Sequence, residues 1–223
     1  MKPTFRDYSL NGRKALEQIL RSSCYGSLPQ TVASLAVFSH PDTVTQTHNQ
    51  NVFRMVRDFK RRNQWDDSDK VVYDDNAGPH MTFIAANSLR PITGKKDLQL
   101  NHIWDGLTQD VGCYTSLANL CVTPSFLAKL TDHSSEIQTL LRFRAYKLYD
   151  WHPSNTQQPV EPPGYGQLEW ADPLDPVSDI EKHFREHMKT KLRNRAVVSA
   201  RKYGWFFSDW KADDKFALHA TAL

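Results

Sequence analysis

The chain has 223 residues, with 28 Lys and Arg against 25 Asp and Glu, a net charge of +3 and an isoelectric point near 8.7. A hydrophobic content of 39% and a mean hydropathy of −0.60 are typical of a polar globular protein that can still bury a core. No apolar run approaches the roughly 20 residues that span a bilayer, and the N-terminus lacks the apolar stretch of a secretory signal. We therefore expect a cytoplasmic protein without a membrane partner.

The three cysteines, Cys24, Cys113 and Cys121, are an odd number and include no C-x-x-C pair. This spacing disfavours both a disulfide framework and a cysteine-rich zinc site. We expect free thiols, with Cys121 in the core.

Helical periodicity predicts three helices in the first third of the chain, over residues 11–22, 28–38 and 45–63, with His40-Pro41 ending the second. The third has apolar residues at helical spacing and a basic surface formed by Arg54, Arg57, Lys60, Arg61 and Arg62. Two interpretations of this charge run stay open: a solvated helix face, or a surface that binds phosphate.

A small sheet is expected after this helix, with one strand at 70–73, a turn at 74–79 and a second strand at 80–86. Asp74 and Asp75 are expected to lie solvated in the turn, and a shared cation is the alternative. A structural role is expected for His80, with the alternative that it is a metal ligand or a second base.

The last third is predicted to begin with helices after Pro124, followed by a Pro-rich polar loop at 153–165 that marks the clearest internal boundary. A capping box at 178–181 starts the longest expected helix, which runs to about residue 203 and carries eight basic residues. An aromatic cluster follows at 205–210. Nucleic-acid contact and a solvated helix docked by its aromatic residues are both open interpretations.

The segment between the predicted sheet and the last third of the chain carries the candidate chemistry. An alternating run at 98–104 contains His102, a polar loop follows, and a second extended run at 116–123 contains Asn119. Hydrolysis of a phosphodiester needs a base for the attacking water and a cation on the phosphate oxygens. A histidine on one strand, held by an asparagine from the next, could supply that base.

These residues resemble the HNH nucleases, which have a ββα-metal fold. Asn101-His102-Ile103 resembles the first motif of the family, and the run from Ser116 to Leu120 resembles the middle motif. The resemblance covers about thirty residues. It implies that His102 is the general base, that Asn119 supports it, that a divalent ion (Mg²⁺ or Mn²⁺) takes part, and that the partner is DNA.

The sequence departs from the family pattern at two positions. Asn101 stands where the family usually has an aspartate that binds the metal, and Ala128 stands where the third motif residue is expected. Asp132 lies one helical turn further along. Asn101 and Asp132 are therefore our hypothetical metal ligands.

We predict an α+β fold in which a ββα unit at 67–153 lies between a helical segment at 1–66 and a linker with a basic helix at 154–223. The predicted function is metal-dependent DNA cleavage by an endonuclease, sequence-specific as in a restriction enzyme or non-specific, with RNA and a homodimer left open. One alternative is a non-catalytic nucleic-acid-binding protein, favoured by Ala128. Another is a different enzyme or a protein–protein module, favoured by the aromatic cluster. The expected nucleic-acid contacts are Lys129, Arg57, Arg61, Lys189 and Arg193.

Overall fold

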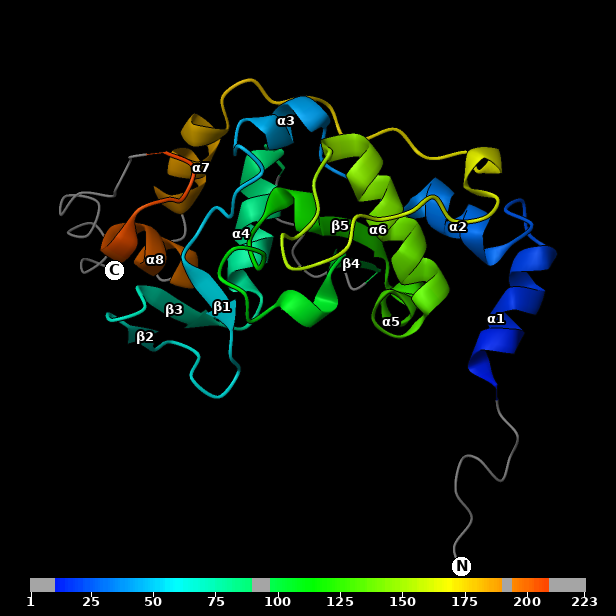
Figure 1. The fold of residues 1–223 in the computed structure, drawn as a ribbon, viewed down its shortest axis with the longest axis horizontal. Helices are drawn as coiled ribbons and strands as arrows, with labels where there is room; N and C mark the ends of the chain where they lie inside the picture. The colour runs from blue at the N-terminus through cyan, green and yellow to red at the C-terminus, as the bar shows by residue number, and fades with distance from the viewer. Residues whose placement is uncertain (1–10, 90–96, 190–193, 209–223) are drawn as a thin grey trace, which may run out of the picture.

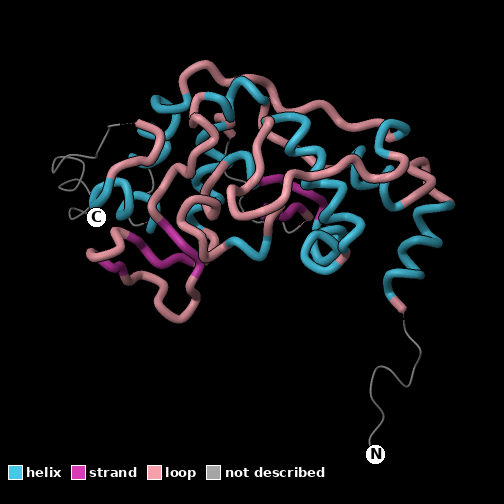
Figure 2. The backbone as a smooth tube through the Cα atoms, viewed as in Figure 1, coloured by secondary structure: helices cyan, strands magenta, loops and turns pink. Residues whose placement is uncertain are grey.

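The structure is a computed structural model that describes residues 11–89, 97–189 and 194–208. Helices flank two small β-sheets, which is the α+β architecture expected from the sequence (Figures 1 and 2). A two-stranded hairpin lies near the middle of the elongated molecule, and a three-stranded sheet lies toward the end opposite α1 (Figure 1). Within the described ranges, no helix has both the length and the apolar character needed to cross a membrane.

The first two predicted helices are present, but the second ends at Leu35, before the predicted stop at His40-Pro41, because Ala36 is extended and Val37 pairs with Val122. α1 (Gly12–Arg21) begins at Asn11 and α2 (Leu28–Leu35) begins at Ser27, and both capping side chains accept a backbone N–H bond from the first turn. α2 packs against α6 and β5 at the centre of the molecule.

The helix predicted over 45–63 is wrong. α3 (Pro41–Thr45) ends at the residue where the predicted helix would begin. His48 and Asn49 then adopt left-handed backbone angles, with φ of 52° and 55°, and a right-handed helix cannot continue through them. The basic residues that follow are therefore presented by a strand and a turn.

A three-stranded sheet takes the place of the predicted helix and hairpin. β3 (Val71–Asp74), which confirms the strand expected at 70–73, pairs in parallel with β1 (Met55–Arg57) and antiparallel with β2 (Trp65–Asp66). The pairing of β1 with β3 crosses the predicted domain boundary at residue 66. Buried side chains from all three predicted segments also share one core.

The strand predicted at 80–86 is wrong, because these residues belong to α4 (Ala77–Ala86). Most of the helix is buried, so its apolar run has no period that separates helix from strand. Asn76 turns the chain from β3 into α4 with a left-handed φ of 62°. Pro79 lies in the first turn, where its missing N–H removes no helical hydrogen bond.

The central hairpin consists of β4 (Leu98–His102) and β5 (Leu120–Pro124), paired antiparallel so that His102 faces Leu120. Their connection contains the 3₁₀ turns η2 (Asp105–Leu107) and η3 (Leu117–Asn119). The extended run predicted at 116–123 is therefore strand only from Leu120 onward.

Two helices follow β5 as the sequence predicts. α5 (Ser125–His133) begins directly after the strand and packs on β4 and β5, and α6 (Ser135–Tyr149) packs on α5. The hairpin and α5 together have the ββα order that the HNH resemblance implies.

The loop expected at 153–165 is the first part of a longer irregular segment that continues past η4 (Tyr165–Gln167) to α7. This segment is bound to the body. The Ala171 amide donates to the Ala33 carbonyl at 3.0 Å, and the Trp170 ring meets the Phe38 ring edge-on at 6.1 Å.

The single helix predicted over 178–203 is wrong. The structure has two helices, α7 (Ile180–Lys189) and α8 (Arg195–Tyr203). α8 has its own N-cap, because the Asn194 side chain accepts from the Ala196 amide at 2.8 Å. Both helices pack on α4, and α8 also covers β3.

Candidate active site

His102 is the last residue of β4 and is half-buried. Its Nε2 lies 3.0 Å from the carbonyl oxygen of Tyr114, and its ring stacks on the Tyr114 ring with centroids 5.3 Å apart. A carbonyl oxygen only accepts hydrogen bonds, so Nε2 carries the proton and Nδ1 of the neutral ring keeps a free electron pair. Burial lowers the pKa of His102 to about 4, so the ring is neutral at pH 7.

Asn119 is fully buried and ties together the loop between the two strands. Its Oδ1 accepts from the Trp104 amide at 2.8 Å, and its Nδ2 donates to the Cys113 carbonyl at 3.0 Å. These contacts fix the chain two residues after His102 and directly before Tyr114. Asn119 thus braces the backbone beside the histidine and beside its hydrogen-bond acceptor.

Tyr114 is held in turn by a buried carboxylate. Its hydroxyl donates to Asp74 Oδ2 at 3.0 Å and accepts from the Asn76 amide at 2.7 Å. Asp74 is completely buried, so its expected solvated position is wrong; it also accepts from the Gly78 amide at 2.6 Å and from Arg195 Nε at 2.5 Å. Burial, together with Asp74, raises the pKa of Tyr114 above its usual range, so the hydroxyl remains a donor.

The predicted ligand Asn101 faces the interior. Its Nδ2 donates to the Gln99 carbonyl at 3.0 Å and to Thr123 Oγ1 at 2.9 Å, and its Oδ1 accepts from Thr131 Oγ1 at 3.3 Å. Only 5% of the residue is exposed. Asn101 therefore joins β4 to β5 and α5, and its amide does not fit the role of a metal ligand.

Asp132, the other predicted ligand, is exposed at the end of α5. Thr131 Oγ1 lies 3.4 Å from its Oδ1, so the threonine hydroxyl separates Asp132 from Asn101. Ala128, at the third motif position, is buried and apolar. Among the residues that the structure describes, no group of three or more His, Cys, Asp and Glu side chains could hold a metal ion.

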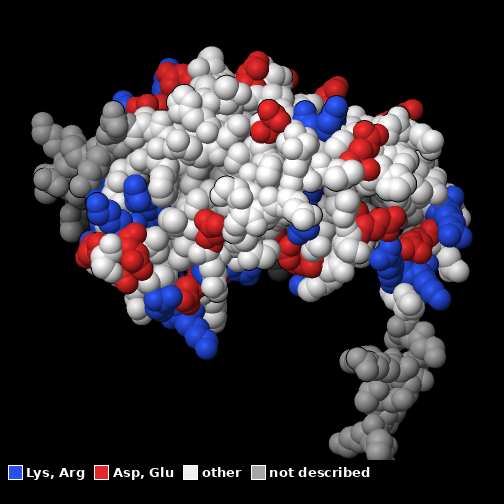
Figure 3. All heavy atoms as spheres, in the orientation of Figure 1, with Lys and Arg blue, Asp and Glu red and all other residues white. Residues whose placement is uncertain are grey.

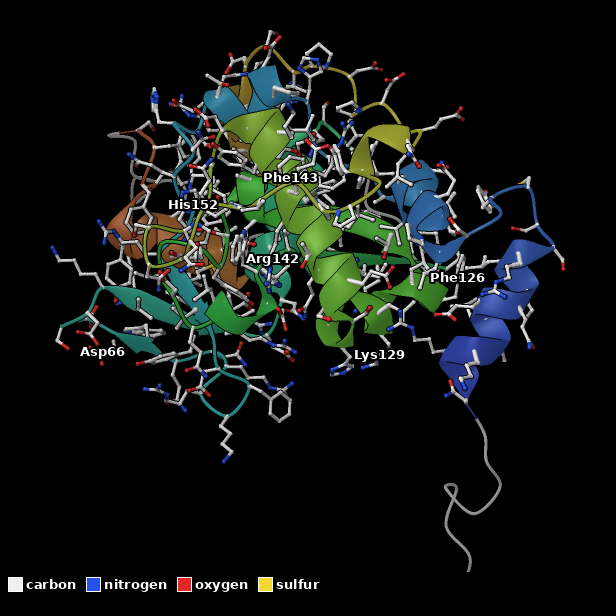
Figure 4. The ribbon with its side chains drawn as sticks, turned by 45° about the vertical axis from the view of Figure 1, so that its right-hand side comes forward. Asp66, Phe126, Lys129, Arg142, Phe143 and His152 are labelled. Carbon is white, nitrogen blue, oxygen red and sulfur yellow. The ribbon has the colours of Figure 1, made fainter. Side chains whose placement is uncertain are left out.

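A cation that the sequence analysis did not single out lies beside the loop. Arg142 of α6 places its NH2 nitrogen 3.5 Å from Asp105 Oδ1, and its guanidinium lies 4.5 Å from the centre of the Trp104 ring (Figure 4). Arg142 Nε also donates to the Ile103 carbonyl at 3.3 Å. The arginine fixes the first residues after His102 against α6.

The predicted nucleic-acid contacts lie in different environments. Arg57 is exposed, and its backbone amide donates to the Thr108 carbonyl at 2.8 Å, which brings β1 next to the loop of the site. Arg61 is instead bound to Asp58 at 2.8 Å and to the Tyr73 hydroxyl at 2.6 Å. Lys129 on α5 and Lys189 on α7 are exposed, and Arg193 lies outside the described residues. Figure 3 shows basic and acidic side chains interspersed over the visible face.

The aromatic cluster docks the C-terminal segment onto the body. Trp205 is 5% exposed, stacks on Phe207 at 5.1 Å and packs on Phe184 of α7 at 5.8 Å. This agrees with the interpretation of a helix docked by its aromatic residues.

His80 is exposed in the first half of α4.

The three cysteines are free thiols, as predicted, with Cys113 and Cys121 buried and Cys24 exposed.

Comparisons of this chain with protein-family models, with curated proteins and with solved structures return no match.

Proposed function

We propose that this chain is an endonuclease that hydrolyses phosphodiester bonds in DNA, with His102 as the general base. The observation that carries the proposal is the hydrogen bond from Nε2 of His102 to the Tyr114 carbonyl. This bond leaves Nδ1 of a neutral ring able to take a proton from water. A positioned base of this kind accelerates hydrolysis by about 10²–10⁴-fold.

The support for the base argues for the same function. Asn119 holds the loop on both sides of the His102–Tyr114 contact, and Asp74 holds the Tyr114 hydroxyl. A catalytic base must keep its geometry while substrate binds, so a buried frame around a half-buried histidine fits a catalytic role better than a packing role. The strand, loop, strand and helix order of the HNH resemblance is consistent with this assignment.

DNA is the proposed substrate because exposed cations lie around the site. Arg57 is beside the loop that carries Tyr114, and its positive charge contributes to the lowered pKa of His102. Lys129 is exposed on α5, the helix that packs on β4. Cations at such positions attract the phosphate backbone independently of sequence. A more specific version of the proposal is that the chain forms a homodimer and cuts a defined DNA sequence.

The Mg²⁺ or Mn²⁺ ion that the resemblance implies receives no step in this proposal. Of the two predicted ligands, Asn101 does not fit. Asp132 remains, and its carboxylate is exposed. A magnesium site normally has one or two carboxylates together with substrate phosphates and water. The cleavage assay with and without a divalent ion therefore tests whether the reaction needs one.

A non-catalytic nucleic-acid-binding protein is the second candidate. The observation in its favour is the metal side of the ββα unit, where Asn101 is bound inside the fold and Ala128 offers no ligand. Such a protein would bind DNA with a strong dependence on salt and leave it intact.

The test is cleavage of supercoiled plasmid with Mg²⁺, with Mn²⁺ and with EDTA. We expect cleavage by the wild-type protein and a loss of about 10²–10⁴-fold in His102→Ala. His133→Ala is the matched control, because His133 is exposed at the end of α5, and it should cut normally. A His102→Ala protein that cuts as well as wild type would overturn the proposal. Salt-dependent binding without cleavage under any of these conditions would select the second candidate.

A further inference from the structure

The loop between β1 and β2, residues 58–64, projects from the edge of the three-stranded sheet (Figures 1 and 2). Its conformation is fixed by Asp58. One oxygen of that carboxylate accepts from the Lys60 amide at 3.0 Å and from the Arg61 amide at 3.1 Å, and the other accepts from Arg61 Nε at 2.8 Å. The Gln64 amide closes the turn by donating to the Arg61 carbonyl at 2.9 Å. A loop held in this way needs little further ordering when it binds a ligand.

Phe59 lies on this loop with 63% of its surface exposed. The guanidinium of Arg62 is 5.1 Å from the centre of its ring. Another exposed aromatic residue of the same region, Trp65, is partly covered by the Lys202 ammonium at 4.4 Å. An exposed phenylalanine beside an arginine on a preorganised loop offers a flat surface on which a planar ring can stack.

The charge around Phe59 complements an anion. Lys60 and Arg57 are exposed, and neither forms an ion pair within the described part of the chain. The one acidic residue of the loop, Asp58, is already bound to Arg61. Figure 3 shows basic side chains at this projecting edge of the molecule. Base stacking on an aromatic ring with phosphates on neighbouring cations is the usual way in which proteins bind single-stranded nucleic acid.

The loop also leads to the candidate active site. β1 ends at Arg57, and the Arg57 amide bonds to Thr108 in the same loop that carries Tyr114. A nucleic-acid strand bound at Phe59 can therefore continue along Arg57 toward His102.

We infer that the β1–β2 loop binds unpaired nucleic acid, either a single strand or an unpaired stretch within a duplex, by stacking one base on Phe59. Arg57 and Lys60 contact the phosphates on either side. The inference rests on the proposed action on nucleic acid and names its substrate class. In an intact duplex each base is already stacked on its neighbours, so Phe59 contributes little there.

The test is fluorescence anisotropy in EDTA, with a labelled 20-nucleotide oligothymidylate and a blunt 20-base-pair duplex as the two probes. Stacking on one aromatic side chain corresponds to about 5- to 150-fold in affinity. We therefore expect Phe59→Leu to weaken binding of the single strand by that factor and to change duplex binding less than about 2-fold. Phe59→Trp should bind the single strand at least as well as wild type.

Phe126→Leu is the matched control, because Phe126 is 53% exposed on α5 and lies away from the β1–β2 loop (Figure 4). It should bind both probes like wild type. Lys60→Gln should lower the slope of log affinity against log salt for the single strand by about 0.7.

Three results would overturn the inference: Phe59→Leu binds the single strand like wild type, Phe59→Leu loses duplex binding equally, or wild type binds neither probe. These results are separate from the test of the proposed function. Binding that depends on Phe59, in a protein whose His102→Ala variant cuts normally, would remove the catalytic assignment and leave the inference standing. Cleavage that depends on His102, with no effect of Phe59→Leu, would do the reverse.

Discussion

Replacement of Asn119 by alanine tests the loop that frames His102. The variant removes two hydrogen bonds, one to the Trp104 amide and one to the Cys113 carbonyl. The Cys113 bond is buried, and without it the carbonyl keeps the longer bond from the Ser116 amide at 3.3 Å, so its loss should cost about 1–3 kcal/mol. The Trp104 bond is only partly buried, and water can replace some of it. The free energy of unfolding should fall by about 2–4 kcal/mol in total.

Urea unfolding followed by circular dichroism measures this loss. With a slope of about 3 kcal/mol per molar for a chain of this size, the unfolding midpoint should fall by about 1 M urea. Asn155→Ala is the control, because Asn155 is exposed in a turn of the irregular segment after α6, and its stability should change by less than about 0.5 kcal/mol. A loss below about 1 kcal/mol for Asn119→Ala, with an unchanged slope, would refute the idea that this amide braces the loop.

Three further predictions concern the frame around the site. Gly78→Ala should lower the free energy of unfolding by about 1–3 kcal/mol, because a Cβ there would lie 2.9 Å from the Met55 sulfur, and a normal urea midpoint would contradict this. Arg195→Gln leaves the buried Asp74 carboxylate without its cation and should cost about 3–5 kcal/mol by the same measurement, whereas a cost below about 1 kcal/mol would show that the pair is dispensable. The pKa of His102 is lower in the folded protein (about 4) than in the unfolded chain (about 6.5), so stability is complete above pH 6.5 and falls as the pH drops toward 4, by up to about 3 kcal/mol. His102→Gln should lose that part of the pH dependence. If His102→Gln and wild type show the same dependence of stability on pH between 7 and 4, His102 is not held neutral by the fold.

Local signals predicted the centre of the molecule well. The alternating run before His102, the second run containing Asn119 and the Pro124-Ser125 start of a helix correspond to β4, β5 and α5. Each of these signals lies within a few residues of the element it predicts. Pattern alone is sufficient there, because β4 alternates apolar and polar residues and β5 is a short apolar run that ends at Pro124.

Prediction from the sequence failed where the structure depends on contacts between residues far apart in the chain. The run at 45–63 has helical spacing, yet β1 forms there because it pairs with β3 and because the chain turns through His48 and Asn49. The apolar run at 80–86 is ambiguous for a different reason, since its burial on most sides leaves no period.

The same limit applies to the site. Motif spacing singled out His102 and Asn119 as candidates, but it could not predict that the Tyr114 carbonyl accepts the hydrogen bond of the histidine. Asp74 and Arg195, which complete the frame, are 121 positions apart in sequence. The one local signal was the Asp-Asp-Asn-Ala-Gly turn that begins at Asp74, the last residue of β3; it indicated a turn but not that the Asp74 carboxylate is buried.

Chemical rescue of His102→Gly tests the catalytic assignment most directly. The substitution removes the imidazole and leaves room for a free imidazole molecule to act as the base. The account predicts that plasmid cleavage falls by about 10²–10⁴-fold and that added imidazole restores a large part of it, while Asn119→Ala is not rescued. Cleavage by His102→Gly at the wild-type rate without imidazole would contradict the account.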